Sequence, residues 1–124
     1  MAQQREIYVC EICGNVLEVL EGGDGELVCC GQPMDLQKEN TVDASKEKHI
    51  PVLTFEGNQV SVEVGSVLHP MEPSHYIAWI EVAEDNCVKR RFFKPGDEPK
   101  ARFFTHGGAL AVRAYCNLHG LWKG

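Results

Sequence analysis

Four of the six cysteines lie within the first 30 residues, and their spacing constrains the fold more than any other feature. Cys10 and Cys13 form a C-x-x-C pair, whereas Cys29 and Cys30 are adjacent. The block that contains them, residues 1–36, is too small to fold on hydrophobic burial alone. We therefore expect a bound metal ion or disulfide bonds to stabilise it.

Four thiolates predict a closed tetrahedral site for zinc or iron, with a structural role, an electron-transferring role, or both. Two disulfides are the weaker alternative, because adjacent cysteines bond each other only with strain. The N-terminus also lacks the apolar run of a secretory signal. The spacing leaves the metal open, since a zinc ribbon repeats C-x-x-C twice and the second pair here has no intervening residue.

Charge is unevenly distributed along the chain. Residues 1–36 hold one arginine against seven acidic residues, while the rest holds eleven of each sign. Because the chain has no basic domain to bind phosphate groups, we do not expect it to bind nucleic acid. The longest apolar run, Tyr76 to Ile80, is far too short to span a bilayer, so we expect no membrane association and a soluble, cytoplasmic protein.

A polar segment at 37–46 predicts a linker between the first block and a second domain over 47–124. The second domain has the alternating pattern of β structure, and no window shows a helical stripe. The run 52–65 predicts a hairpin turning at Gly57-Asn58, with alternate valines from 60 to 64 on one face. About seven short strands predict an antiparallel sandwich or barrel of immunoglobulin-like character. Further strands are expected over 75–82, 87–93, 100–105 and 109–116.

The histidines all belong to the second domain. His49, His69 and His75 lie in or beside loops at strand ends, where a rigid β scaffold can aim side chains at one point. Cys116 and His119 form a C-x-x-H pair that can chelate one ion. Four imidazoles and one thiolate favour an ion that accepts five or six ligands, and iron is the natural candidate. We assign no role to His106 or to Cys87, which we expect to be partly buried.

Seven stretches spread over the whole chain resemble the desulfoferrodoxin family, the two-iron form of superoxide reductase. They are "YVCEICGN", "LVCCGQPM", "EKHIPV", "GSVLHPM", "SHYIAWIE", "FFKPGDEP" and "YCNLHGLWK". The resemblance implies a mainly β protein, with a small desulforedoxin-like domain before an immunoglobulin-like β domain of the neelaredoxin type.

The resemblance also implies two iron ions per chain. A ferric ion would be held by Cys10, Cys13, Cys29 and Cys30. The second, ferrous or ferric, would be held equatorially by His49, His69, His75 and His119 and axially by Cys116. Glu47 and Lys48 match a catalytic "EK" pair in the family, in which the lysine steers superoxide and organises a proton-donating water, and the glutamate closes on the ferric ion. A homodimer and rubredoxin or a similar small carrier as electron donor are implied as well.

Other functions stay open at this point. The chain could be a non-catalytic iron electron carrier or a zinc-stabilised binding module, in which the histidines are incidental. A dismutase is a third possibility, since it would oxidise superoxide as well as reduce it.

Overall fold

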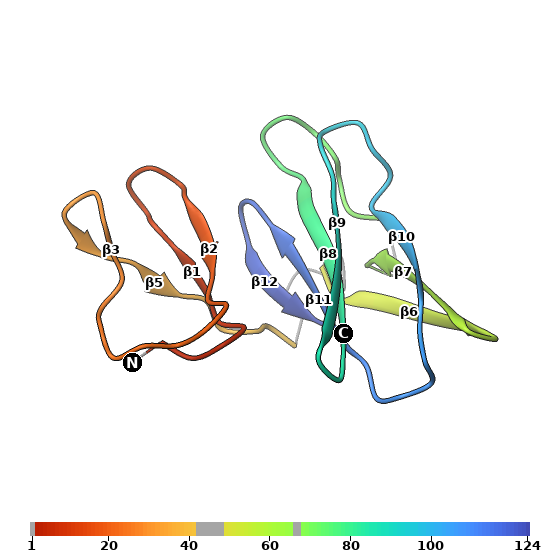
Figure 1. Ribbon diagram of the computed structural model, residues 1–124. Helices are drawn as coiled ribbons and strands as arrows, with labels where there is room; N and C mark the ends of the chain where they lie inside the picture. The colour runs from red at the N-terminus through yellow and green to blue at the C-terminus, as the bar shows by residue number, and fades with distance from the viewer. Residues whose placement is uncertain (1, 42–48, 66–67) are drawn as a thin grey trace. The chain divides into compact units, whose positions relative to one another are not determined.

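The computed structural model describes residues 2–41, 49–65 and 68–124, which form two compact units, Met1–Lys38 and Glu39–Gly124. The division falls within the predicted linker, 37–46. The described residues contain strands and no helix, so none of them forms a helix able to cross a membrane. The expectation of a mainly β protein is therefore confirmed (Figure 1).

The described residues of the first unit form five short strands. β1 lies between β2 and β5 in one antiparallel sheet, and β3 and β4 form a separate hairpin. Among its described residues only Ile7, Cys10 and Met34 are buried. Three side chains are a very small core, which agrees with the need for a metal ion. The strands are β1 (Ile7–Val9), β2 (Val16–Glu18), β3 (Val28–Cys29), β4 (Gln32–Pro33) and β5 (Asp35–Leu36).

In the second unit the described residues form a sandwich of seven strands in two antiparallel sheets, in the orders β10-β7-β6 and β12-β11-β8-β9 (Figure 1). The number agrees with the prediction of about seven, although the runs named from the sequence include no strand at β12. The strands are β6 (Pro51–Glu56), β7 (Gln59–Val64), β8 (Ile77–Glu84), β9 (Cys87–Phe92), β10 (Lys100–Phe104), β11 (Ala111–Cys116) and β12 (Gly120–Lys123).

The core lies between the two sheets. On β7, Val60, Val62 and Val64 are completely buried, as their alternation predicts. They pack against residues of the other sheet that include Ile80 and Ala114. Each buried valine contributes roughly 1.5–3 kcal/mol, so this interface fixes which face of every strand points inward.

The predicted hairpin is present as β6–β7, and the strands expected over 75–82 and 87–93 form a second hairpin, β8–β9. Gly57 and Asp85, the first residues of their turns, have positive φ angles of 57° and 51°, as tight two-residue turns require. The strands on either side of the "HGG" segment, β10 and β11, do not pair with each other. β10 pairs with β7 and β11 with β8, so the loop between them crosses from one sheet to the other. The pattern did not reveal β12.

Two candidate metal centres

Two tight turns place the four cysteines of the first unit. Between Cys10 and Asn15 the chain folds back, because the Cys10 N–H donates to the Asn15 carbonyl (2.9 Å) and the Gly14 N–H donates to the Cys10 carbonyl (2.9 Å). Between β3 and β4, Cys30 and Gly31 both have left-handed backbone, with φ of 52° and 77°. This turn lets two adjacent cysteines direct their sulfurs to one place, which ordinary extended backbone would not allow.

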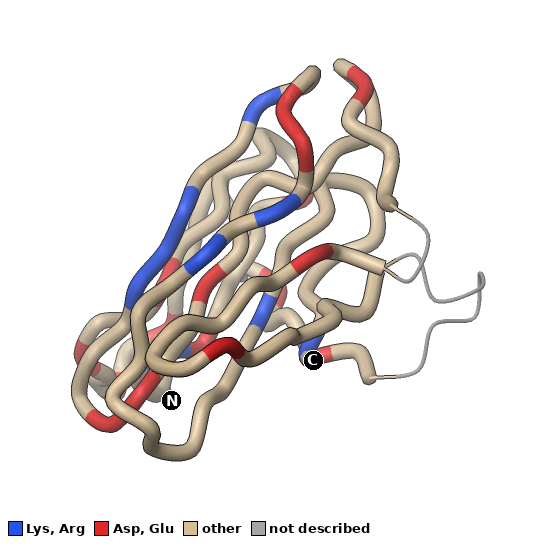
Figure 2. Tube along the Cα trace, turned by 90° about the vertical axis from the view of Figure 1, so that its right-hand side faces the viewer, with Lys and Arg blue, Asp and Glu red and all other residues tan. Residues whose placement is uncertain are grey.

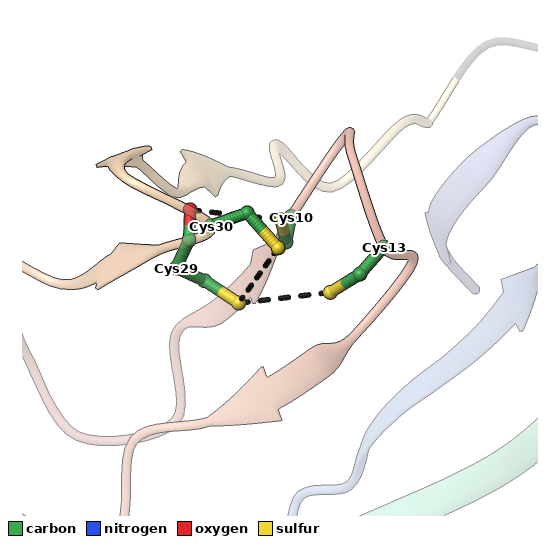
Figure 3. A group of neighbouring side chains, drawn as sticks. All are labelled: Cys10, Cys13, Cys29 and Cys30. Atoms are coloured by element: carbon green, nitrogen blue, oxygen red, sulfur yellow. Dashed lines mark hydrogen bonds between the residues drawn. The ribbon is translucent and has the colours of Figure 1, made fainter.

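The four sulfurs converge from the two turns, as Figure 3 shows. All lie within 4.8 Å of one another, and the Cys13–Cys29 and Cys29–Cys30 sulfurs are 3.6 and 4.0 Å apart. A tetrahedral ion with metal–sulfur bonds of 2.3 Å requires sulfurs about 3.8 Å apart. The distances fit a metal and exclude disulfides, and all six cysteines are free thiols in the structure.

The thiols do not ionise independently. Backbone N–H groups of Cys13 and Ile12 face the Cys10 sulfur and lower the pKa of that thiol to about 7. The neighbouring sulfurs of Cys13 and Cys10 raise the pKa of Cys30 to about 12. Four thiolates at neutral pH therefore need a cation among them, which is what a metal site provides. The Gly14 N–H donates to the Cys10 carbonyl rather than to a sulfur.

The second cluster gathers at one end of the sandwich from strand ends that are distant in sequence. His49 precedes β6, His69 follows β7 and His75 precedes β8. Cys116 is the last residue of β11, and His119 precedes β12. The β11–β8 register shifts between Tyr115 and Cys116, which marks a bulge next to the site.

The four imidazoles form a ring. Neighbouring ring centroids are 4.7 Å apart for His49–His69, 4.5 Å for His69–His75, 5.0 Å for His75–His119 and 4.7 Å for His119–His49. The His49–His75 diagonal is 6.2 Å. Four nearly equal sides and a longer diagonal describe an approximate square, which is the arrangement of four equatorial ligands around one ion.

Cys116 supplies a fifth donor. Its side chain is completely buried, and its sulfur lies 3.7 Å from Nδ1 of His119. Donor atoms of His49, His75, Cys116 and His119 all lie within 4.8 Å of one another, whereas His69, whose ring borders those of His49 and His75, falls outside this limit. Burial raises the pKa of the Cys116 thiol, although the N–H groups of Leu118 and His119 face the sulfur and lower it in part. A bound cation would overcome that burial cost and hold the thiolate.

His69 provides a direct test of whether the cluster fits a metal. Its Nδ1 lies 2.7 Å from the Pro70 carbonyl, which can only accept, so Nδ1 carries the hydrogen and Nε2 keeps a lone pair. This Nε2 is buried and has no hydrogen-bond partner within the described ranges. Burial also lowers the pKa of His69 to about 4, so the ring is neutral. A buried, neutral nitrogen with its tautomer fixed by a carbonyl is typical of a metal ligand.

Two supporting residues escaped the sequence analysis. Trp122, on β12, stacks on the ring of His49 with centroids 4.7 Å apart and an interplanar angle of 17°. Asn117 accepts the Tyr76 N–H (2.8 Å) and donates to the Ser74 carbonyl (3.1 Å), so it fastens the segment around His75 to the turn after Cys116. In the sequence, the only indication of a role for Trp122 was that an aromatic residue lies three positions after His119.

Of the four remaining residues, two lie outside both clusters and two fall outside the described residues. Glu47 and Lys48 fall outside the described residues. His106 belongs to neither cluster, and its backbone N–H donates to the Glu84 carboxylate. Cys87 begins β9 and is exposed, so the expectation of partial burial was wrong.

Comparisons with known proteins agree with this geometry. Residues 41–124 match the family model Desulfoferrodoxin, and residues 2–37 match Desulfoferrodoxin, N-terminal domain. A desulfoferrodoxin homolog from Archaeoglobus fulgidus is 56% identical over 123 residues, covering 99% of this chain and 98% of that protein. A superoxide reductase from Pyrococcus abyssi is 41% identical over 65% of this chain and 87% of its own length. The crystal structure of the superoxide reductase from Treponema pallidum superposes with a TM-score of 0.80 at 28% identity, covering 99% of both chains.

Proposed function

Because this chain belongs to the desulfoferrodoxin family, we propose that it is a superoxide reductase. The reaction takes up one electron and two protons per superoxide and yields one hydrogen peroxide, with the oxygen–oxygen bond intact. The electron comes from an external donor. Iron at both centres is the cofactor that this proposal requires.

The observation that carries the proposal is the square of four imidazoles beside the buried Cys116 sulfur. A structural zinc site is complete with four ligands, whereas this cluster offers five. A fifth donor on one side of a square of nitrogens suits an ion that changes oxidation state and keeps a position for substrate. A non-catalytic carrier would need only the four-cysteine centre.

Iron bound in the square would supply the one-electron couple and the coordination position for the substrate anion. Residues of the chain itself orient the ligands and adjust the charge on the sulfur. Pro70 fixes the tautomer of His69, and Trp122 orients the ring of His49. The N–H groups of Leu118 and His119 face the Cys116 sulfur and withdraw charge from it. With iron bound, the Cys116 thiolate would donate electron density to the ion and so favour release of the product.

Lys48 and Glu47 complete the proposal. The chain is acidic, with a formal charge of −6, so rapid reaction with an anion needs a local positive charge near the site. Lys48 adjoins His49 in sequence and would attract superoxide and organise a water that donates a proton. Glu47 would close on the oxidised site as a resting-state ligand.

The proposed role of Lys48 can be tested through ionic strength. In Lys48→Ala, the rate constant for superoxide should fall by about tenfold at low salt, because the attraction of the anion is lost. The fall should shrink as salt is added, since salt already screens the wild-type charge. Pulse radiolysis over a salt series measures both effects, and an unchanged rate and salt dependence would remove Lys48 from the mechanism.

The proposal also covers the role of the four-cysteine iron, the oligomeric state and the electron donor. The four-cysteine iron either relays electrons or stabilises the fold, and Cys13→Ser with retained reductase turnover would favour the structural role. We propose a cytoplasmic homodimer that takes electrons from rubredoxin or a similar small carrier and has no nucleic-acid partner.

Metal analysis of the purified protein tests the function against its main alternative. Two irons per chain, with the reduced protein removing superoxide, support a reductase. One zinc and no second metal would instead favour a binding module.

A further inference from the structure

The two sheets of the sandwich end side by side at β9 and β10, and basic residues cover that edge. β9 and β10 are the outermost strands of their sheets. Lys89 of β9 bridges them, because its Nζ lies 2.6 Å from the Phe104 carbonyl of β10. Figure 2 shows the Lys and Arg positions along these two neighbouring strands in blue. We call this surface the basic edge and define it as Lys89, Arg91, Lys100 and Arg102.

An open groove of about 390 Å³ runs along the basic edge, lined by Arg91, Lys100 and Arg102 with Ser61 and Glu63 of β7. Three cations and one carboxylate line the groove, and a second carboxylate, that of Glu98, lies 3.7 Å from Lys100, so the groove keeps a net positive charge. Most of the remaining charge on this acidic chain has the opposite sign.

The two arginines of the groove differ from the other three in the chain. Arg5, Arg90 and Arg113 each form an ion pair with a glutamate. Neither Arg91 nor Arg102 has an acidic partner among the residues that the structure describes. Both are exposed, and the Arg91 guanidinium lies over the Phe93 ring at 5.7 Å. Two planar guanidinium groups are thus available to bind carboxylates of another molecule.

The groove is connected to the histidine cluster by hydrogen bonds. Val64, which follows Glu63, donates its N–H to the Pro99 carbonyl (3.1 Å), and Pro99 precedes Lys100. The Val64 carbonyl accepts the N–H of His69 (3.2 Å). A molecule bound in the groove is therefore linked to a proposed iron ligand through a short stretch of backbone and one hydrogen bond.

We propose that the basic edge is the docking surface for the electron donor, a small acidic electron-carrier protein. This inference rests on the proposed function, because a reductase must be reduced once per superoxide consumed. Carboxylates of the carrier bind Arg91 and Arg102, and the carrier then passes one electron to the oxidised protein. The carrier is oxidised by one electron, and no bond is made or broken. An acidic carrier is repelled by most of this chain, so a local cationic surface sets where it docks.

Stopped-flow mixing of chemically reduced rubredoxin with the oxidised, iron-loaded protein tests the proposal. The groove variant is Arg91→Glu with Arg102→Glu. The matched control is Lys38→Glu with Lys123→Glu, which changes net charge equally at two exposed lysines outside the groove. At low salt the groove variant should react with rubredoxin at least tenfold more slowly and lose most of its salt dependence, while the control changes by less than about twofold. The neutral pair Arg91→Gln with Arg102→Gln should fall between wild type and the reversed pair.

Equal slowing of the groove variant and the control would overturn the proposal, because net charge alone would then explain it. A change in the solution mass of the groove variant with an unchanged rubredoxin rate would also overturn it, and would assign the groove to a second copy of the chain. Pulse radiolysis of the pre-reduced variants distinguishes a failure of the docking proposal from a failure of the proposed function. Superoxide removal at the wild-type rate shows an intact active site, whereas its absence in wild type would contradict the proposed function itself.

Discussion

The tautomer and the burial of His69 both indicate that this residue binds a metal ion. Its Nδ1 is committed to a carbonyl, and its buried Nε2 finds no donor in the described part of the chain. In an ordinary folded core such a nitrogen costs about 1–3 kcal/mol, so natural structures rarely leave one unsatisfied. A metal ion removes that cost, which makes the tautomer of His69 a physical argument for the centre.

Cys116→Ser tests the axial donor. The oxidised, iron-loaded wild type should show a visible thiolate-to-iron charge-transfer band, because the Cys116 sulfur lies 3.7 Å from Nδ1 of His119. The serine variant should lose that band entirely while its four-cysteine centre keeps its own spectrum. A persisting band from the histidine centre would show that another group is the axial ligand.

Trp122 is expected to support His49 rather than to react. Trp122→Leu removes the stacked ring and should weaken iron binding at the histidine centre by about tenfold, as loss of other ligand-orienting contacts does. Trp122→Phe keeps an aromatic face and should bind iron within about threefold of wild type. Competition with a chelator measures both affinities, and equal affinities for Leu and Phe would contradict the orienting role.

The predicted ligands and their supporting residues differ in how visible they are in the sequence. Cysteine and histidine are uncommon, and their spacing at strand ends marks all nine positions. In the sequence, nothing distinguishes Trp122 from other aromatic residues, because only the folding of β12 places it against His49. Asn117 acts through two bonds to a segment about forty residues earlier, a pairing that no local pattern encodes.

At the scale of strands, hairpins were predictable and sheet membership was not. The β6–β7 and β8–β9 hairpins depend on local alternation and two-residue turns, both of which are visible in sequence. The partners of β10 and β11 depend on long-range packing, so the loop between them could equally suggest a third hairpin. β12 has only four residues and lacked a clear alternating signal.

Glu84 holds that crossing loop in place. Its carboxylate accepts the N–H groups of His106 (2.8 Å) and Gly108 (3.2 Å), and the side chain is buried. Glu84→Ala should lower the free energy of unfolding by about 1–3 kcal/mol, because two backbone donors lose their acceptor. Glu98→Ala is the control, since its exposed ion pair with Lys100 contributes less than about 1 kcal/mol. Urea denaturation measures both, and equal losses would contradict the account.

At the scale of the whole molecule, the last nine residues complete the histidine centre. They contain Cys116, His119 and the strand β12 with Trp122. Removing residues 116–124 should abolish iron binding at the histidine centre while the four-cysteine centre, which belongs to the other compact unit, still binds metal. Iron content and the separate visible spectra of the two centres measure this. Loss of both metals together would show that the two units do not fold independently.

We expect the protein to reduce superoxide without also oxidising it, and the yields of the two products test this most directly. The fully reduced, iron-loaded protein is mixed anaerobically, without an electron donor, with several equivalents of superoxide, and hydrogen peroxide and dioxygen are both measured. We expect the protein to form one hydrogen peroxide for each electron that it stored and then to stop, with no dioxygen beyond uncatalysed dismutation. One dioxygen for every two superoxide ions, with catalysis continuing without a donor, would identify a dismutase and contradict this expectation.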